Sequence, residues 1–195
     1  MYPHSEALIL EAANLSWRGS GERHPAAVDP TTGVHSRRWL DTALPRQIAL
    51  SIREQSPLAL LIVEIDHAAE YRAEFGDEAR DRALYATAQT MLNSVRPTDS
   101  VVRYDAARFA VLVPQADVAG ARVVAERVRR AIGAAGIMMS DKSVLPSVTV
   151  SIGVAEFDPF ADAEELLAAG EHAVEVAQAD GYDRVCTAPL AAFAA

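Results

Sequence analysis

The most marked feature of the residue pattern is an apolar run over positions 58–65, in which Glu64 is the only polar residue. An uninterrupted run of this length is typical of a strand that is buried on both faces of a sheet. Two further apolar segments, 101–102 and 109–113, flank a short polar stretch. This arrangement predicts a β-hairpin with its turn at Asp105–Arg108, and we expect functional residues at or near this turn.

Helical periodicity separates the predicted strands. Apolar residues recur at three- and four-residue spacing over 77–95 and over 118–132, which predicts two helices with a core-facing stripe. An earlier helix contains Pro45, where we expect a kink or the end of its first half. Asp162 begins a fourth helix, because a glutamate three residues later completes a capping-box pattern.

Two more segments complete the predicted sheet. Residues 148–154 alternate between apolar and polar positions, and residues 184–187 form a short last strand. The order of strands and helices predicts an α+β fold in which helices flank a central sheet. We expect an N-terminal arm and linker over 1–28, one domain over 29–188 and a C-terminal tail over 189–195.

The overall charge limits the class of partner. The chain has 195 residues and a net charge of −9, from 27 acidic and 18 basic side chains. Such a chain repels nucleic-acid polymers, although a few arginines can form a local site for a small phosphorylated ligand. No apolar run approaches the roughly 20 residues of a transmembrane helix, so we expect no membrane span and a cytoplasmic location. Cys186 is the only cysteine, which excludes an internal disulfide.

A motif at the predicted hairpin resembles a known family. The pattern Arg96-x-x-Asp99 precedes the first hairpin strand, and Arg103 and Phe109 flank the turn. This combination resembles the signature hairpin of GGDEF domains, the diguanylate cyclases of bacteria. The resemblance covers most of the chain. It implies a nucleotidyl-cyclase-like fold with a mostly antiparallel central sheet.

The resemblance also allows a comparison with the family's enzyme site, which joins GTP molecules with the help of carboxylate-bound Mg²⁺. In place of the signature Gly-Gly-Asp/Glu-Glu, this chain has Asp105, Ala106, Ala107 and Arg108. Other family positions carry Glu64 (metal ligand), Gln178 and Tyr182 (phosphate-facing cations), Arg72 (guanine-binding Asn) and Asp81 (guanine-binding Asp). A methyl group cannot bind a metal, and a guanidinium repels one. The resemblance therefore predicts a degenerate domain with no catalytic residue, no metal and no cofactor.

Arg108 raises a separate question, because it stands where the family has an acid. We hypothesise that its side chain folds back onto Glu64 and Asp66, where its charge replaces that of a metal. The alternative is that Arg108 extends from the turn into solvent.

Arg96 and Asp99 are the stronger candidates for a binding site. An arginine fork donates to guanine O6 and N7 or to a phosphate, and a carboxylate accepts from guanine N1–H and N2–H. In the family, this pair forms the inhibitory site for the product, cyclic di-GMP, and Arg127 falls at a further arginine of that site. The alternative is a solvated pair at a helix end.

The sequence therefore predicts a catalytically inactive GGDEF-like protein that acts as a receptor for cyclic di-GMP. We expect it to signal to a protein partner in trans or through a ligand-linked homodimer. Two alternatives stay open. One is a nucleotide-independent interaction scaffold, and the other is a GTP-binding regulator without cyclase activity that uses Arg72 and Asp81.

Overall fold

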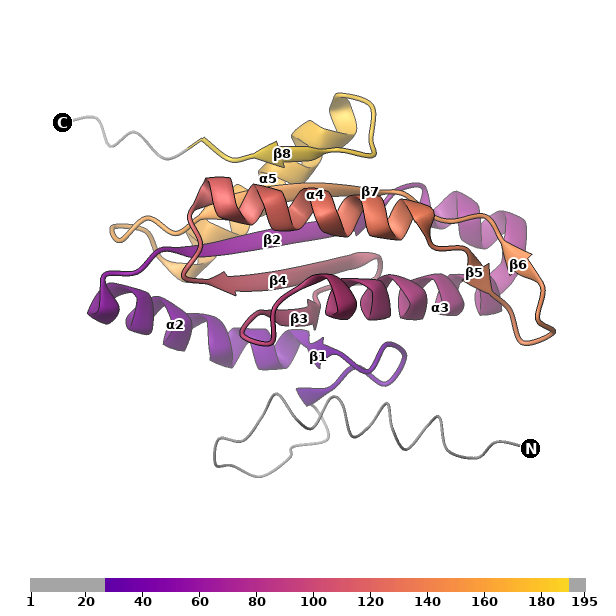
Figure 1. Ribbon diagram of the computed structural model, residues 1–195, viewed down its shortest axis with the longest axis horizontal. Coiled ribbons are helices and arrows are strands. Elements are labelled where there is room, and N and C mark those ends of the chain that lie inside the picture. Colours follow the sequence, from indigo (N-terminus) through magenta and orange to yellow (C-terminus); the bar gives the residue numbers. More distant parts are fainter. Residues whose placement is uncertain (1–26, 190–195) are drawn as a thin grey trace.

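A six-stranded sheet with helices on both faces forms the centre of the computed structural model, which describes residues 27–189 (Figure 1). In spatial order the strands are β1 (His35–Ser36), β3 (Ser100–Arg103), β4 (Arg108–Pro114), β2 (Leu58–Ile65), β7 (Val150–Glu156) and β8 (Val185–Thr187). The four central strands pair antiparallel, and β1 and β8 add in parallel at the two edges. This architecture confirms the predicted α+β fold.

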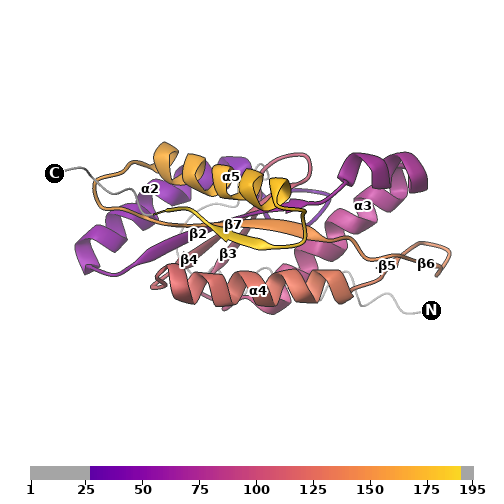
Figure 2. The same ribbon diagram turned by 90° about the horizontal axis from the view of Figure 1, so that it is seen from above.

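Four helices cover the sheet, namely α2 (Arg37–Glu54), α3 (Ala68–Ser94), α4 (Val118–Ala134) and α5 (Ala163–Ala179). Figure 2 shows α2 and α5 on one side of the sheet and α4 on the other. Leu61 and Val63 of β2 pack into the core under α3 and α4, whereas Leu60 and Ile62 pack into the core under α2 and α5. This alternation explains why β2 is apolar on both of its faces.

The register of β2 positions the polar end of the sheet. Glu64 lies opposite Arg108 of β4 on one side and opposite Ser151 of β7 on the other. The turn of the β3–β4 hairpin therefore lies beside the carboxyl end of β2. On β7, Gly153 permits a close approach of α5, because a Cβ there would lie 2.1 Å from the carbonyl oxygen of Gly170.

The helices differ from the prediction in two places. Helix α3 begins at Ala68, and its second part matches the predicted segment after a break at Gly76, whose φ is +88°. A positive φ favours glycine, which lacks the Cβ that would clash. Helix α2 continues through Pro45 to Glu54. The predicted capping box at Asp162 is confirmed, because its side chain accepts from the Glu165 amide and the Glu165 carboxylate accepts from the Asp162 amide.

A small hairpin of β5 (Ile137–Met138) and β6 (Val144–Leu145) was not predicted. Most of the expected N-terminal arm and C-terminal tail lies outside the described residues, so their proposed boundaries stay predictions. None of the helices between residues 27 and 189 combines the length and apolar character needed to cross a bilayer.

Candidate functional site

An ion pair occupies the polar end of β2. The Arg108 Nε atom donates to Glu64 Oε2 at 2.6 Å. The side chains of Arg108 and Glu64 are 32% and 21% exposed, so solvent only partly screens the pair. Burial disfavours the charge on Arg108, but the hydrogen bond and charge of Glu64 hold its pKa above the ordinary value. The structure therefore confirms the predicted contact between Arg108 and Glu64.

Asp66 does not take part in that pair. It is 4% exposed and accepts hydrogen bonds from the Thr149 hydroxyl at 2.7 Å, the Ser151 hydroxyl at 2.7 Å and the Asp183 amide at 3.1 Å. The expected contact between Arg108 and Asp66 is therefore wrong. Neutral donors of Thr149, of Ser151 in β7 and of the loop before β8 satisfy the Asp66 carboxylate in place of the guanidinium.

Side chains of the hairpin form hydrogen bonds with the backbone of its turn. The Asp105 carboxylate accepts from the backbone amide of Ala106 at 2.7 Å. The Arg103 guanidinium donates to the carbonyl oxygens of Asp105 and Ala106, and its Nη1 atom is buried without a partner. Burial lowers the pKa of Arg103. Ala107 belongs to the same turn, and its carbonyl accepts from the Ile65 amide at 3.0 Å.

A second layer of contacts supports the turn. The Tyr104 hydroxyl donates to Glu171 Oε1 of α5 at 2.5 Å, and the Arg37 guanidinium lies 4.2 Å from the centre of the Tyr104 ring. Burial and then the bond to Glu171 raise the pKa of Tyr104. Glu171 also contributes to the electrostatic field at Arg108.

The loop after α5 contacts the residues that directly follow β2. Tyr182 has a φ of +62°, and its ring centroid lies 4.3 Å from that of His67. Gln178 lies in the last turn of α5, where its carbonyl accepts from the Gly181 amide at 3.0 Å. Tyr182 is therefore part of the same region, next to Asp66.

Arg72 and Asp81 lie on α3, on opposite sides of the break at Gly76. Arg72 Nε donates to Asp77 Oδ1 at 2.6 Å, and Asp81 Oδ1 accepts from Arg80 Nη2 at 2.8 Å. A shallow groove of about 400 Å³ lies along this part of α3, and Arg72 lines it. Each of the two predicted guanine-binding side chains is thus paired with a neighbour on its own helix.

The Arg96-x-x-Asp99 segment forms a tight turn between α3 and β3. The Asp99 Oδ2 atom accepts from the Arg96 amide at 2.8 Å, whereas Asp99 Oδ1 is buried without a hydrogen-bond partner. Burial raises the pKa of Asp99, whereas the Arg96 amide, the charge of Arg96, the Thr98 side chain and the charge of Arg127 act in the opposite direction. The Arg127 Nε atom donates to the Ser94 carbonyl at 2.7 Å, which ties α4 to the end of α3. The structure therefore brings all three predicted residues into one electrostatic neighbourhood.

Sequence reasoning missed the donors that surround Asp66. The available signal was the alternation around Thr149 and Ser151, because two small hydroxyl side chains at alternate positions of a strand point to one face. No pattern in the sequence indicated that the Arg103 guanidinium would be partly buried against the turn. Among residues 27–189, no three His, Cys, Asp or Glu side chains form a group that could hold a metal ion.

Comparison with known proteins places this arrangement in context. The family model described as "Diguanylate cyclase, GGDEF domain" matches residues 26–184. The chain is 29% identical over 163 residues to the diguanylate cyclase DosC of Escherichia coli K12, which covers 84% of this chain and 35% of DosC. The chain thus spans about a third of the length of this relative.

Two solved structures share the fold. The GGDEF domain of DgcB from Caulobacter crescentus, in complex with c-di-GMP, superposes with a TM-score of 0.81 and 23% identity over 89% of this chain and 100% of that one. The diguanylate cyclase SiaD from Pseudomonas aeruginosa, in complex with its activator SiaC, gives a TM-score of 0.79 and 25% identity over 94% of this chain and 68% of that one.

Proposed function

The chain belongs to the GGDEF domain family, and we propose that it is a member without cyclase activity that binds cyclic di-GMP through Arg96, Asp99 and Arg127. In this proposal the protein reports the ligand to a protein partner or through a ligand-linked homodimer.

The contacts at the hairpin turn support the loss of catalysis. Joining nucleotides at their phosphates needs carboxylates that hold Mg²⁺. Here the Glu64 carboxylate faces Arg108 at 2.6 Å, and Ala107 offers no side-chain ligand. The donor set therefore does not fit a divalent cation. In addition, the Asp105 carboxylate takes the Ala106 amide that a phosphate would otherwise approach.

The single observation that carries the binding proposal is the unpaired Oδ1 atom of Asp99 in the field of Arg96 and Arg127. A buried acceptor without a partner is unfavourable by about 1–3 kcal/mol, so a ligand whose binding displaces the atoms that cover Oδ1 and donates to it recovers part of this free energy. The Watson–Crick edge of guanine supplies such donors, and phosphates are natural partners for the two arginines. The solved DgcB domain, which shares this fold, carries c-di-GMP.

A thermal-shift panel tests the proposal. Cyclic di-GMP should raise the melting temperature of the protein, because a ligand that binds only the folded state stabilises it. GTP with Mg²⁺ should leave the melting temperature unchanged, and incubation with both should yield no cyclic di-GMP. Formation of the cyclic product would contradict the proposed loss of catalysis. A shift with GTP alone would favour a GTP-binding regulator.

A further inference from the structure

The β8 edge of the sheet is open among the described residues. β8 is last in the strand order, and within residues 27–189 it pairs only with β7. The Ile152 amide donates to the Arg184 carbonyl, and the Ala188 amide donates to the Val154 carbonyl. Because backbone groups alternate along a strand, the peptide groups of Val185 and Thr187 face away from β7. An open edge of this kind is a template for another strand.

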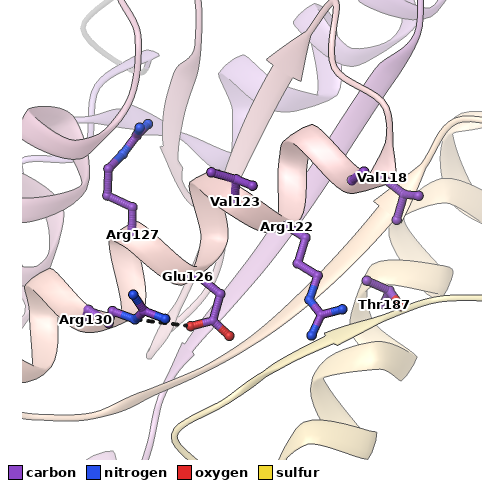
Figure 3. Close-up of a pocket in the computed structure, with 8 residues that line it drawn as sticks. Val118, Arg122, Val123, Glu126, Arg127, Arg130 and Thr187 are labelled. Atoms are coloured by element: carbon purple, nitrogen blue, oxygen red, sulfur yellow. Dashed lines mark ion pairs between the residues drawn. The ribbon is translucent and has the colours of Figure 1, made fainter.

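A groove of about 780 Å³ lies directly beside this edge (Figure 3). Its walls are α4 and Thr187 of β8, and its apolar part includes Val118 and Val123, the latter 66% exposed. Figures 1 and 2 show α4 running alongside β8, so the groove follows the direction of the strand. A segment that lies in the groove would therefore reach the open peptide groups of β8.

The groove is positively charged, although the chain as a whole carries −9. Arg122 extends from α4 towards Thr187 and forms no ion pair within residues 27–189 (Figure 3). Arg130 contacts Glu126 only loosely, with 3.7 Å between Nε and Oε2, and its side chain is 75% exposed. Glu126, the one acidic residue that lines the groove, also accepts from Arg129 Nε at 3.2 Å. The groove therefore offers two accessible cations to an anionic partner.

Arg127 also lines the groove but extends to the other side of α4 from Arg122 (Figure 3). Its Nε atom donates to the Ser94 carbonyl, near the Arg96-x-x-Asp99 turn. The groove and the proposed nucleotide site therefore lie on different sides of the same helix and use different arginines.

We propose that the groove between α4 and β8 binds an extended acidic segment of a partner protein, which adds to the sheet as a strand beside β8. The open peptide groups favour a polypeptide over other polyanions, since strand addition relies on backbone hydrogen bonds. The two arginines favour carboxylates in that segment, and Val123, next to Arg122 on α4, adds an apolar contact.

The distance between the two arginines sets the expected spacing of the acidic residues in the bound segment. Arg122 and Arg130 are eight residues apart on α4, which is about 12 Å along the helix axis. An extended chain covers about 3.3 Å per residue, so about four residues separate the matching acids. Residues at i and i+4 of a strand point to the same face, as does the residue midway between them. The expected pattern is Glu-x-x-x-Glu, and its middle residue, which lies level with Glu126, should be uncharged.

Fluorescence anisotropy with the full chain and a labelled peptide, Ser-Glu-Thr-Val-Thr-Glu-Ser, tests the proposal. We expect saturable binding that weakens at least about tenfold in the Arg122→Glu/Arg130→Glu variant, because both charges reverse. The matched control is Arg38→Glu/Arg46→Glu on α2, which makes the same change of charge at exposed arginines away from the groove. The control should bind the peptide like the wild type.

Two further peptides test strand pairing. One carries N-methyl groups on its two Thr residues, and the other carries them on Val and the second Glu. Only one of the two sets of amides faces β8, so one peptide should lose binding and the other should keep it. Equal binding of both peptides would overturn strand addition. Absence of saturable binding by the unmodified peptide, or equal weakening by both arginine variants, would overturn the groove as the site.

The proposal does not depend on nucleotide binding. The Arg96→Ala/Asp99→Ala variant should bind the acidic peptide like the wild type, even where it fails to bind cyclic di-GMP. A loss of peptide binding at the groove and a loss of cyclic di-GMP binding are therefore distinguishable results. If Arg122→Glu/Arg130→Glu dissociated a dimer of this chain without affecting the peptide, a second copy would be the occupant and the proposal would be wrong.

Discussion

The two ends of strand β3 differ in how their charged groups are satisfied. At the hairpin turn, the carboxylates of Glu64, Asp66 and Asp105 all accept hydrogen bonds from the protein itself. At the opposite end, Asp99 keeps one oxygen without a partner and the Arg96 side chain is exposed. A satisfied carboxylate gains little from a ligand, whereas an unsatisfied acceptor gains a bond. For a ligand that donates hydrogen bonds, the Arg96-x-x-Asp99 end therefore offers the less satisfied carboxylate, whereas the turn keeps an unpaired donor at Arg103 Nη1.

The largest expected effect comes from removing the most completely satisfied group at the turn. Asp66→Ala should lower the free energy of unfolding by about 3–5 kcal/mol, because it removes a buried carboxylate and leaves one buried and two partly buried donors without an acceptor. Urea unfolding followed by circular dichroism measures this change. The matched control is Asp105→Ala, an exposed carboxylate, which should lower the free energy by less than about 1 kcal/mol. Equal effects of both substitutions would contradict the assigned role of Asp66.

The next effect concerns the opposite end of β3. Arg96→Ala should weaken binding of cyclic di-GMP by about 1–3 kcal/mol, the range for losing one bidentate contact to a base. Equilibrium binding at constant salt measures it. Arg72→Ala, at an exposed arginine of α3 where the sequence comparison predicted a guanine contact, should leave the affinity unchanged. A loss of affinity with Arg72→Ala alone would place the ligand at the other site.

A smaller effect concerns the strength of the ion pair between Glu64 and Arg108 beside the turn. A double-mutant cycle of Glu64→Ala and Arg108→Ala should give a coupling free energy of about 1 kcal/mol, since the pair is only partly buried. The exposed pair Arg37–Asp41, at 2.9 Å, is the matched reference and should give a smaller coupling. A Glu64–Arg108 coupling near zero would mean that the guanidinium does not compensate the carboxylate.

The smallest effect is a pH dependence at Asp99. Burial raises its pKa above the ordinary 3.8, so the folded state holds the proton more tightly than the unfolded chain does. Asp99 therefore stabilises the fold below pH 3.8, and this contribution is lost as the pH rises through the folded-state pKa. As the pH rises from 3.8 through the folded-state pKa, the free energy of unfolding of the wild type should fall by less than about 1 kcal/mol relative to that of Asp99→Asn. The effect is small because solvent screens the half-buried carboxylate. Urea unfolding at several pH values would show a flat difference if the pKa were not raised.

Much of the fold could be predicted from periodicity, because β2, the β3–β4 hairpin and α4 have strong patterns of apolar residues. The small hairpin of β5 and β6 could not, since two-residue strands leave no period to detect. At the site, opposite charges made the pairing of Glu64 with Arg108 predictable. The surroundings of Asp66 were missed, because the alternation of Thr149 and Ser151 indicates a shared face but not which acid they contact, and these residues and Asp183 lie far along the chain from Asp66.

The most direct test of the account is a calorimetric titration with cyclic di-GMP of the wild type and of the Arg96→Ala/Asp99→Ala variant. The matched control is Arg72→Ala/Asp77→Ala, which removes an exposed pair of the same charge types on α3. The account predicts saturable binding by the wild type and the control, and no binding by the Arg96→Ala/Asp99→Ala variant. Equal binding by all three proteins, or no binding by the wild type, would contradict it.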